Sequence, residues 1–111
     1  LDDCEKLEGL NTFAARFTAR LARQRIEYES ARFGEDHNWS AIHDALAVCA
    51  SIDETVLENV EEVACRAGLS GSADGEVLID RREVPEKANA SIALSANKEK
   101  FLAMLCQLFA D

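Results

Sequence analysis

Apolar residues recur at steps of three and four between residues 3 and 33, a spacing that predicts one long amphipathic helix. The expected core stripe comprises Leu7, Leu10, Ala14, Phe17, Leu21, Tyr28 and Ala31, with Arg16, Arg20 and Arg23 on the opposite side. Gln24 interrupts the stripe after Leu21, which predicts a kink or an end near that point. Gly34 is a natural stop signal for the helix.

Two further helices are predicted after the polar turn of residues 34–38. The second covers residues 39–50, has Asn38 as its N-cap, and places Trp39, Ile42, Ala45, Leu46 and Cys49 on one face. The third begins at the capping-box pattern Ser51-Ile52-Asp53-Glu54 and ends at Gly68. Its apolar arc contains Val56, Leu57, Val60, Val63, Ala64 and Ala67, and its acidic arc contains Glu54, Glu58, Glu61 and Glu62.

The remaining pattern predicts a loop, a short helix and a long final helix. Residues 68–84 are loop-like, and the apolar triplet 77–79 is too short to establish a strand. Pro85 suits the first turn of a short helix that ends at residue 93. The last helix, residues 96–110, presents Phe101, Leu102, Met104, Leu105, Leu108 and Phe109. Four main helices with short connections predict an all-α helix bundle that forms a single domain over residues 1–111.

Acidic residues are concentrated in the middle of the chain. The net charge is −9 at pH 7, from 21 acidic and 12 basic side chains, and residues 35–80 alone carry eleven acids against one base, Arg66. This balance disfavours nucleic acid and anionic membranes as partners, because both are negatively charged. The acidic segment is interpreted either as a solvated surface or as a binding face for a basic protein partner.

The four cysteines, Cys4, Cys49, Cys65 and Cys106, predict two disulfides and an extracytoplasmic location, either secreted or periplasmic. Four free thiols in a cytoplasmic protein are the alternative. Cys49 and Cys65 would lie about 15 Å apart along an antiparallel helix pair, beyond disulfide reach. Two arrangements therefore stay open: Cys4–Cys49 with Cys65–Cys106, or Cys4–Cys65 with Cys49–Cys106.

The sequence contains none of the common catalytic or metal-binding motifs. It lacks C-x-x-C, H-x-x-x-H, H-E-x-x-H, a P-loop and G-x-G-x-x-G. His37 and His43 are six positions apart, which places them on different sides of a helix. The glutamates of the predicted third helix lie opposite its apolar arc, so they lack the burial that acid–base catalysis requires. We therefore expect no enzyme activity, no cofactor and no metal.

These observations favour a small acidic binding protein of the inhibitor or immunity type. Asp53, Glu54, Glu58, Glu61 and Glu62 are the residues expected to contact a basic partner surface. One alternative is a helical carrier that encloses an apolar ligand among Phe13, Phe17, Trp39, Leu46, Phe101, Leu105 and Phe109. A structural homo-oligomer is the other alternative.

Overall fold

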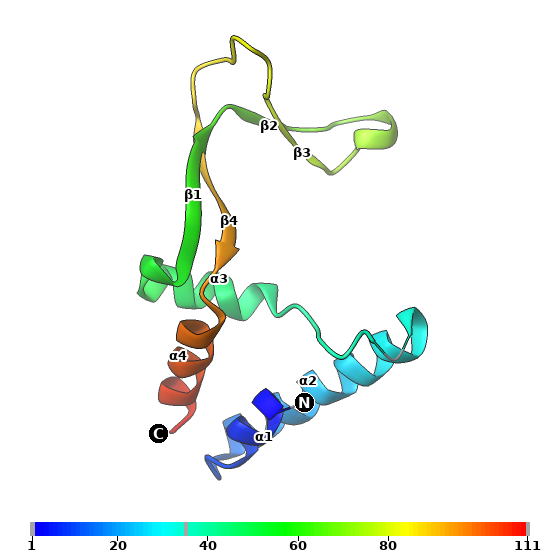
Figure 1. Ribbon diagram of the computed structural model, residues 1–111, viewed down its shortest axis with the longest axis vertical. Helices are drawn as coiled ribbons and strands as arrows, with labels where there is room; N and C mark the ends of the chain where they lie inside the picture. Colours follow the sequence, from blue (N-terminus) through cyan, green and yellow to red (C-terminus); the bar gives the residue numbers. More distant parts are fainter. Residues whose placement is uncertain (1, 35, 111) are drawn as a thin grey trace. The chain divides into compact units, whose positions relative to one another are not determined.

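The computed structural model describes residues 2–34 and 36–110, and these residues form a mixed α/β structure (Figure 1). The helices are α1 (Asp2–Glu8), α2 (Phe13–Phe33), α3 (His43–Ile52) and α4 (Lys98–Ala110). The strands are β1 (Leu57–Val63), β2 (Cys65–Ala67), β3 (Val77–Ile79) and β4 (Ala90–Ala96), and two short 3-10 turns are η1 (Glu54–Val56) and η2 (Gly71–Ala73). The expectation of an all-α bundle is therefore wrong.

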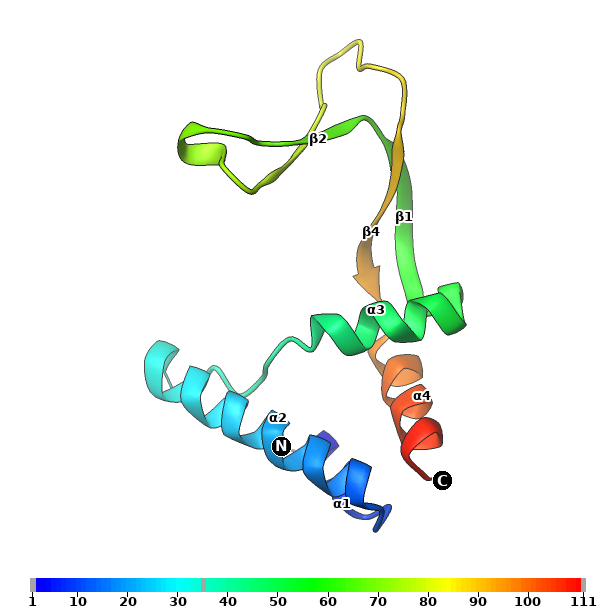
Figure 2. The same cartoon turned by 180° about the vertical axis from the view of Figure 1, so that it is seen from behind.

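The chain divides into two compact units. Unit 1 comprises residues 1–56 and 97–111, and unit 2 comprises residues 57–96. By these bounds α1, α2, α3 and α4 belong to unit 1, and β1, β2, β3 and β4 belong to unit 2. Figures 1 and 2 show these elements from opposite sides. No helix within the described ranges has the length and apolar character needed to cross a membrane.

The core of unit 1 is small and rich in cysteine and alanine. Its buried residues are Cys4, Leu7, Ala19, Cys49 and Leu105, contributed by all four helices. Partly buried side chains pack around them: Leu10, Ala22, Ile26, Ala45, Phe101, Met104, Cys106 and Phe109. The final helix predicted for residues 96–110 is confirmed as α4, and its apolar side contributes to this core.

The single helix predicted for residues 3–33 is two helices. The break lies at residues 9–12, where Asn11 adopts φ 62° and Thr12 caps α2 by accepting a hydrogen bond from the Ala15 N–H at 3.2 Å. The Thr12 hydroxyl also donates to the Phe109 carbonyl at 2.6 Å, which ties the break to α4. Gly34 ends α2 as predicted, with φ 108° and its N–H donating to the Ser30 carbonyl.

The buried side of α2 is opposite to the predicted one. Ala15, Ala19 and Glu29 are buried, and Ala22 and Ile26 on the same side are partly buried. The large apolar residues of the predicted stripe, among them Phe17, Leu21 and Tyr28, are half or more exposed. Small side chains allow α2 to approach its neighbours closely, whereas the bulky stripe is left uncovered. The helix consequently has two apolar faces.

Unit 2 contains two separate antiparallel pairs of strands. β1 pairs with β4 from Leu57 opposite Ala96 to Val63 opposite Ala90, and β2 pairs with β3. The third helix predicted for residues 51–67 is therefore wrong, because those residues form the end of α3, η1, β1 and β2. The short helix predicted after Pro85 is wrong as well, since β4 begins at Ala90. Residues 77–79, which the sequence alone left undecided, form β3.

Candidate functional site

The acidic residues predicted to form one helical face do not form one. Asp53 caps the end of α3 and Glu54 belongs to η1, both in unit 1, whereas the other three residues lie on β1 in unit 2. Because side chains alternate along a strand, Glu58 and Glu62 point to one side of β1 and Glu61 points to the other. Glu61 pairs with Arg81 at 3.1 Å. The predicted binding face is thus divided between two units and between two sides of a strand.

The predicted disulfides are also absent, since all four cysteines are free thiols. Cys4 and Cys49 are buried in the core of unit 1, and Cys106 packs against that core. Burial raises the pKa of the Cys49 thiol. Cys65 lies on β2 in unit 2, so the antiparallel helix pair from which its pairing was argued does not form.

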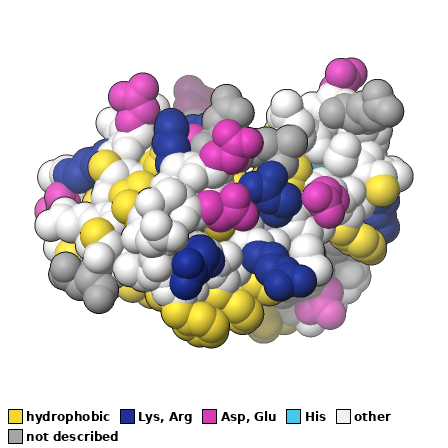
Figure 3. Space-filling model, turned by 90° about the horizontal axis from the view of Figure 1, so that it is seen from below, with side chains coloured by type: hydrophobic (Ala, Val, Ile, Leu, Met, Phe, Trp, Pro, Cys, Tyr) yellow, Lys and Arg dark blue, Asp and Glu magenta, His cyan; other side chains and the backbone are white. Residues whose placement is uncertain are grey.

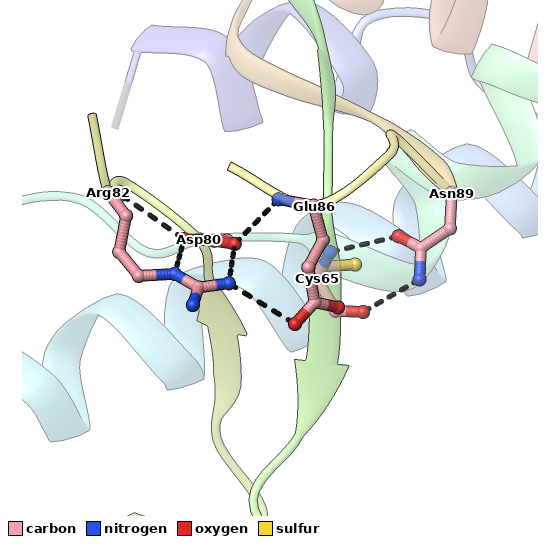
Figure 4. A network of polar contacts seen from close by, with 5 residues as sticks. All are labelled: Cys65, Asp80, Arg82, Glu86 and Asn89. Atoms are coloured by element: carbon pink, nitrogen blue, oxygen red, sulfur yellow. Dashed lines mark hydrogen bonds and ion pairs between the residues drawn. The ribbon is translucent and has the colours of Figure 1, made fainter. Parts of the chain in front are cut away.

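A polar network joins the strands of unit 2 to the loop before β4 (Figure 4). Asp80 accepts two hydrogen bonds from the Arg82 guanidinium, at 2.6 and 2.8 Å, and one from the Glu86 N–H at 2.9 Å. These bonds hold the pKa of the Asp80 carboxyl far below its usual range. Asn89 pairs with the backbone of Cys65 in both directions, at 2.8 and 2.9 Å. Each of these polar groups forms a hydrogen bond with another group of the network, so the network stabilises the loop.

A different group of side chains gathers where α2 ends and the chain turns toward α3. The rings of Phe33 and His37 have centroids 5.3 Å apart, and those of His37 and Trp39 are 4.3 Å apart. We call these three residues the aromatic row. The His37 Nε2 lies 3.5 Å from a carboxylate oxygen of Glu29, which is 8% exposed.

Glu29 anchors this group from α2. Burial raises the pKa of the Glu29 carboxyl, but hydrogen bonds from Arg25, Ser40 and His37 outweigh burial, so its pKa is lowered overall. The carboxylate is therefore charged at neutral pH and can hold the imidazole of His37 in place. Among the residues described, Glu29 is the one buried charged side chain.

His43 and Asp44 follow a few residues later, at the start of α3, and both are exposed. Within residues 2–34 and 36–110, neither side chain forms a hydrogen bond or ion pair, so both are accessible for chemistry with a ligand. No group of three His, Cys, Asp or Glu within these ranges could hold a metal ion.

Sequence reasoning missed this segment because it assigned Trp39 to the core face of a helix. Trp39 lies in the connection before α3 and is 58% exposed. The contact between Phe33 and His37 depends on the reversal of the chain at Gly34, where φ is 108°. The pattern of apolar positions carries no signal for such a contact. The proximity of an acidic residue, a histidine and two aromatic residues in the sequence was the one available clue.

Comparison with known proteins gives one informative result. No family model matches the chain, and no curated protein matches it. Among solved structures, the chain is similar to a purine-preferring ribonucleoside hydrolase from Gardnerella vaginalis, with a TM-score of 0.76 and 19% identity. The match covers 98% of this chain and 34% of that one. At this identity the likeness shows the fold alone, and the chain spans about a third of the hydrolase.

Proposed function

We propose that this chain forms part of an enzyme that hydrolyses purine ribonucleosides. The observation that carries the proposal is the match of nearly the whole chain, 98%, to one third of a purine-preferring ribonucleoside hydrolase. A match restricted to a common motif would cover a small part of the chain. Here the match includes the helices and strands of both units, because it covers nearly the whole chain.

The surface of α2 supports this proposal. Phe13, Phe17, Leu21 and Tyr28 lie on one side of the helix and are 78%, 52%, 50% and 58% exposed. The opposite side of the same helix packs into the core of unit 1. A helix that is apolar on both sides is typically covered on both sides. Figure 3 shows exposed hydrophobic side chains gathered beside Lys and Arg on the face seen from below.

The strands of unit 2 support it as well. Each of the two sheets described has only two strands, and pairs of this size are marginally stable by themselves in water. Both sheets leave strand edges unpaired within the described ranges, and such edges favour pairing or covering by further protein. We therefore propose that the remaining two thirds of a hydrolase-like fold cover these surfaces.

His43 is the candidate acid for this reaction. Breaking the bond between ribose and a purine requires a proton for the departing base, and histidine suits proton donation near neutral pH. The two histidines differ in this respect. His37 is held by Glu29 and lies between two rings, whereas His43 is exposed at the start of α3 and has no such partner among the described residues.

The test is an assay of the complete gene product that contains residues 1–111. Release of free ribose is measured with inosine, adenosine and guanosine, and with uridine and cytidine for comparison. We expect release from the purine ribonucleosides, and a loss of about 10²-fold or more in kcat for His43→Asn. A folded protein, verified by circular dichroism, that releases ribose from none of the five would refute the proposal. Normal activity of His43→Asn would remove His43 from its assigned role.

Binding of a basic protein through the acidic segment stays a prediction, and it is a second candidate function. Its support is that Glu58 and Glu62 are exposed on the same side of β1. If a purified basic partner binds the gene product, Glu58→Lys with Glu62→Lys should lower its association rate severalfold at low salt. Glu99→Lys, an exposed acid on α4, is the matched control. Salt-independent binding that the double reversal leaves unchanged would contradict this function.

A further inference from the structure

The start of α3, which carries His43, has little packing to hold it. Residues 41–44 are all exposed, and Ile42 precedes the helix without a side-chain hydrogen bond that caps it. The first apolar residue of α3 that packs against the core of unit 1 is Ala45, and the first buried one is Cys49. Contacts with the core therefore do not fix the position of His43.

The connection before α3 is held from α2 instead. The buried carboxylate of Glu29 accepts a hydrogen bond from Ser40 and lies 3.5 Å from the His37 Nε2. His37 is fixed a second time, because its N–H donates to the Gly34 carbonyl at 2.9 Å. One side chain of α2 thus holds two points of the connection, and the second point, Ser40, is three positions before His43.

A carboxylate suits this arrangement. Its two oxygens accept several hydrogen bonds at once, and Arg25 supplies a further one from the preceding turn of α2 at 2.5 Å. Burial of a charge is unfavourable unless it is well paired, and Glu29 is 8% exposed. An apolar side chain would fill the same space without this penalty, but it could not bind Ser40 and His37. The buried charge therefore serves to fix the connecting segment.

We propose that Glu29 is a positioning residue, which places the imidazole of His43 by holding the segment before it. This inference rests on the proposed function, in which His43 donates a proton to the departing base. Ser40 and Ala45 are the two fixed points that flank the start of α3, with residues 41–44 between them. Loss of the bond to Ser40 frees these residues, and a displacement of about 1 Å at a catalytic site can lower the rate about 10²-fold.

Steady-state kinetics of the complete gene product with inosine test the proposal. Glu29→Gln and Ser40→Ala should each lower kcat about 10-fold and change KM less than about 2-fold, because a proton donor acts in the transition state. Ser40→Thr keeps the hydroxyl and should retain most of the wild-type kcat. Glu27→Gln, which removes an exposed carboxylate of α2, is the matched control and should behave like the wild type.

Combination with His43→Asn distinguishes positioning from a general structural effect. Because Glu29 acts through His43 in this proposal, Glu29→Gln should cause no further loss of kcat in the His43→Asn background. A side chain that merely stabilises the fold would lower kcat in that background by the same factor as in the wild type. Additive losses in the double variant would therefore overturn the positioning role.

Hydrogen exchange measures the positioning itself, independently of activity. The Leu46 N–H donates to the Ile42 carbonyl at 3.2 Å, in the first turn of α3. Its exchange should be about 10-fold faster in Glu29→Gln and in Ser40→Ala, because the start of the helix opens more often. The Asp53 N–H, which donates to a carbonyl at the other end of α3, should exchange as in the wild type.

The outcomes separate this inference from the proposed function. Ribose release that Glu29→Gln and Ser40→Ala leave unchanged overturns the inference and leaves the hydrolase intact. Absence of ribose release in the wild type refutes the hydrolase, and exchange at Leu46 then decides whether Glu29 positions the start of α3. Circular dichroism identifies a variant that fails to fold. If Glu29→Gln does so, Ser40→Ala carries the comparison, because Ser40 lies outside the helices.

Discussion

Asp53 links three parts of unit 1 through one carboxylate. Its Oδ2 lies 2.6 Å from the Lys100 Nζ, and its Oδ1 accepts hydrogen bonds from the Thr55 N–H and hydroxyl at 3.0 and 2.7 Å. The Asp53 carboxylate thereby connects the end of α3, η1 and the first turn of α4. Two sets of hydrogen bonds lower the pKa of the Asp53 carboxyl from 3.8 to about 2. The bond from Lys100 has the larger effect, and those from Thr55 come second.

The lowered pKa predicts a pH-dependent contribution to stability. A carboxyl whose pKa is lower in the folded state stabilises the fold above its unfolded pKa, and this stabilisation disappears as the pH falls toward the folded pKa. The Asp53 contribution should therefore be complete above about pH 4 and disappear as the pH falls to about 2. Asp53→Asn should lower the free energy of unfolding at pH 7 and flatten its decrease between pH 4 and 2.

Urea denaturation of the wild type and Asp53→Asn at pH 7, 4 and 2.5 tests this prediction. Glu99→Gln is the control, since Glu99 is an exposed carboxylate on the same helix as Lys100. Parallel pH profiles for the wild type and Asp53→Asn would contradict the role assigned to Asp53.

Single residues also show what the sequence can and cannot predict. Gly34 was identified correctly as the end of a helix, because a glycine that follows a helical pattern is a local stop signal. Thr12 caps α2, but this cap was hidden within a continuous apolar spacing. Trp39 could not be placed, because its neighbours His37 and Phe33 meet through a turn and not through helical spacing.

At the scale of elements, β1 shows why residues 57–63 were mistaken for helix. Their apolar and acidic positions fit a helical wheel, and no glycine or proline interrupts them. The strand forms because residues 90–96, far away in the sequence, pair with six of its residues. Pairing of distant segments is not encoded in local spacing, so the strands were not predicted.

The turn between β2 and β3 depends on Gly68. A Cβ at this position would lie 1.8 Å from the Ala73 carbonyl oxygen, so any larger residue requires the backbone to move. The Gly68 N–H donates to the Glu76 carbonyl at 2.8 Å, and the Gly75 N–H donates to the Gly68 carbonyl at 3.0 Å. This close approach explains a glycine that the sequence had suggested as a helix end.

Gly68→Ala should therefore disrupt the β2–β3 pair, with a destabilisation of about 1–3 kcal/mol, typical of overpacking. Hydrogen exchange measures this effect as faster exchange of amides in residues 65–67 and 77–79, which are paired in the structure. Gly9→Ala is the matched control, because the nearest atom to its Cβ would be 3.4 Å away. Unchanged protection in Gly68→Ala would contradict the close approach.

At the scale of the whole molecule, the four cysteines contribute to packing and do not cross-link the chain. The sequence favoured two disulfides, whereas the structure has four free thiols and a core in which Cys4 and Cys49 act as small apolar residues. The extracytoplasmic location stays a prediction, but the disulfides on which it depended are absent. The acidic charge of residues 35–80 is likewise spread over helix, turn and strand instead of one face.

Thiol counting tests this picture. Without reductant, the denatured protein should react with four equivalents of Ellman's reagent. In the native protein Cys65 and Cys106, which are partly buried, should react before Cys4 and Cys49, because the last two are 4% and 1% exposed and burial raises the pKa of Cys49. Cys65→Ser should reduce the amplitude of the fast phase. Fewer than four reactive thiols after denaturation would contradict this picture, because it would show that a disulfide is present.

Unit 2 enters and leaves unit 1 at adjacent points, since the Asn97 N–H donates to the Val56 carbonyl at 2.8 Å. A long segment between two fixed ends normally carries an entropic cost of closing the loop. Antiparallel pairing of β1 with β4 brings the two ends of unit 2 together. The hydrogen bonds between these strands therefore offset the entropic cost of closing the loop. Lengthening or shortening the end of the β1–β4 pair that is far from unit 1 would leave the junction with unit 1 unchanged. Related chains can therefore differ in length within unit 2 without destabilising the helical core.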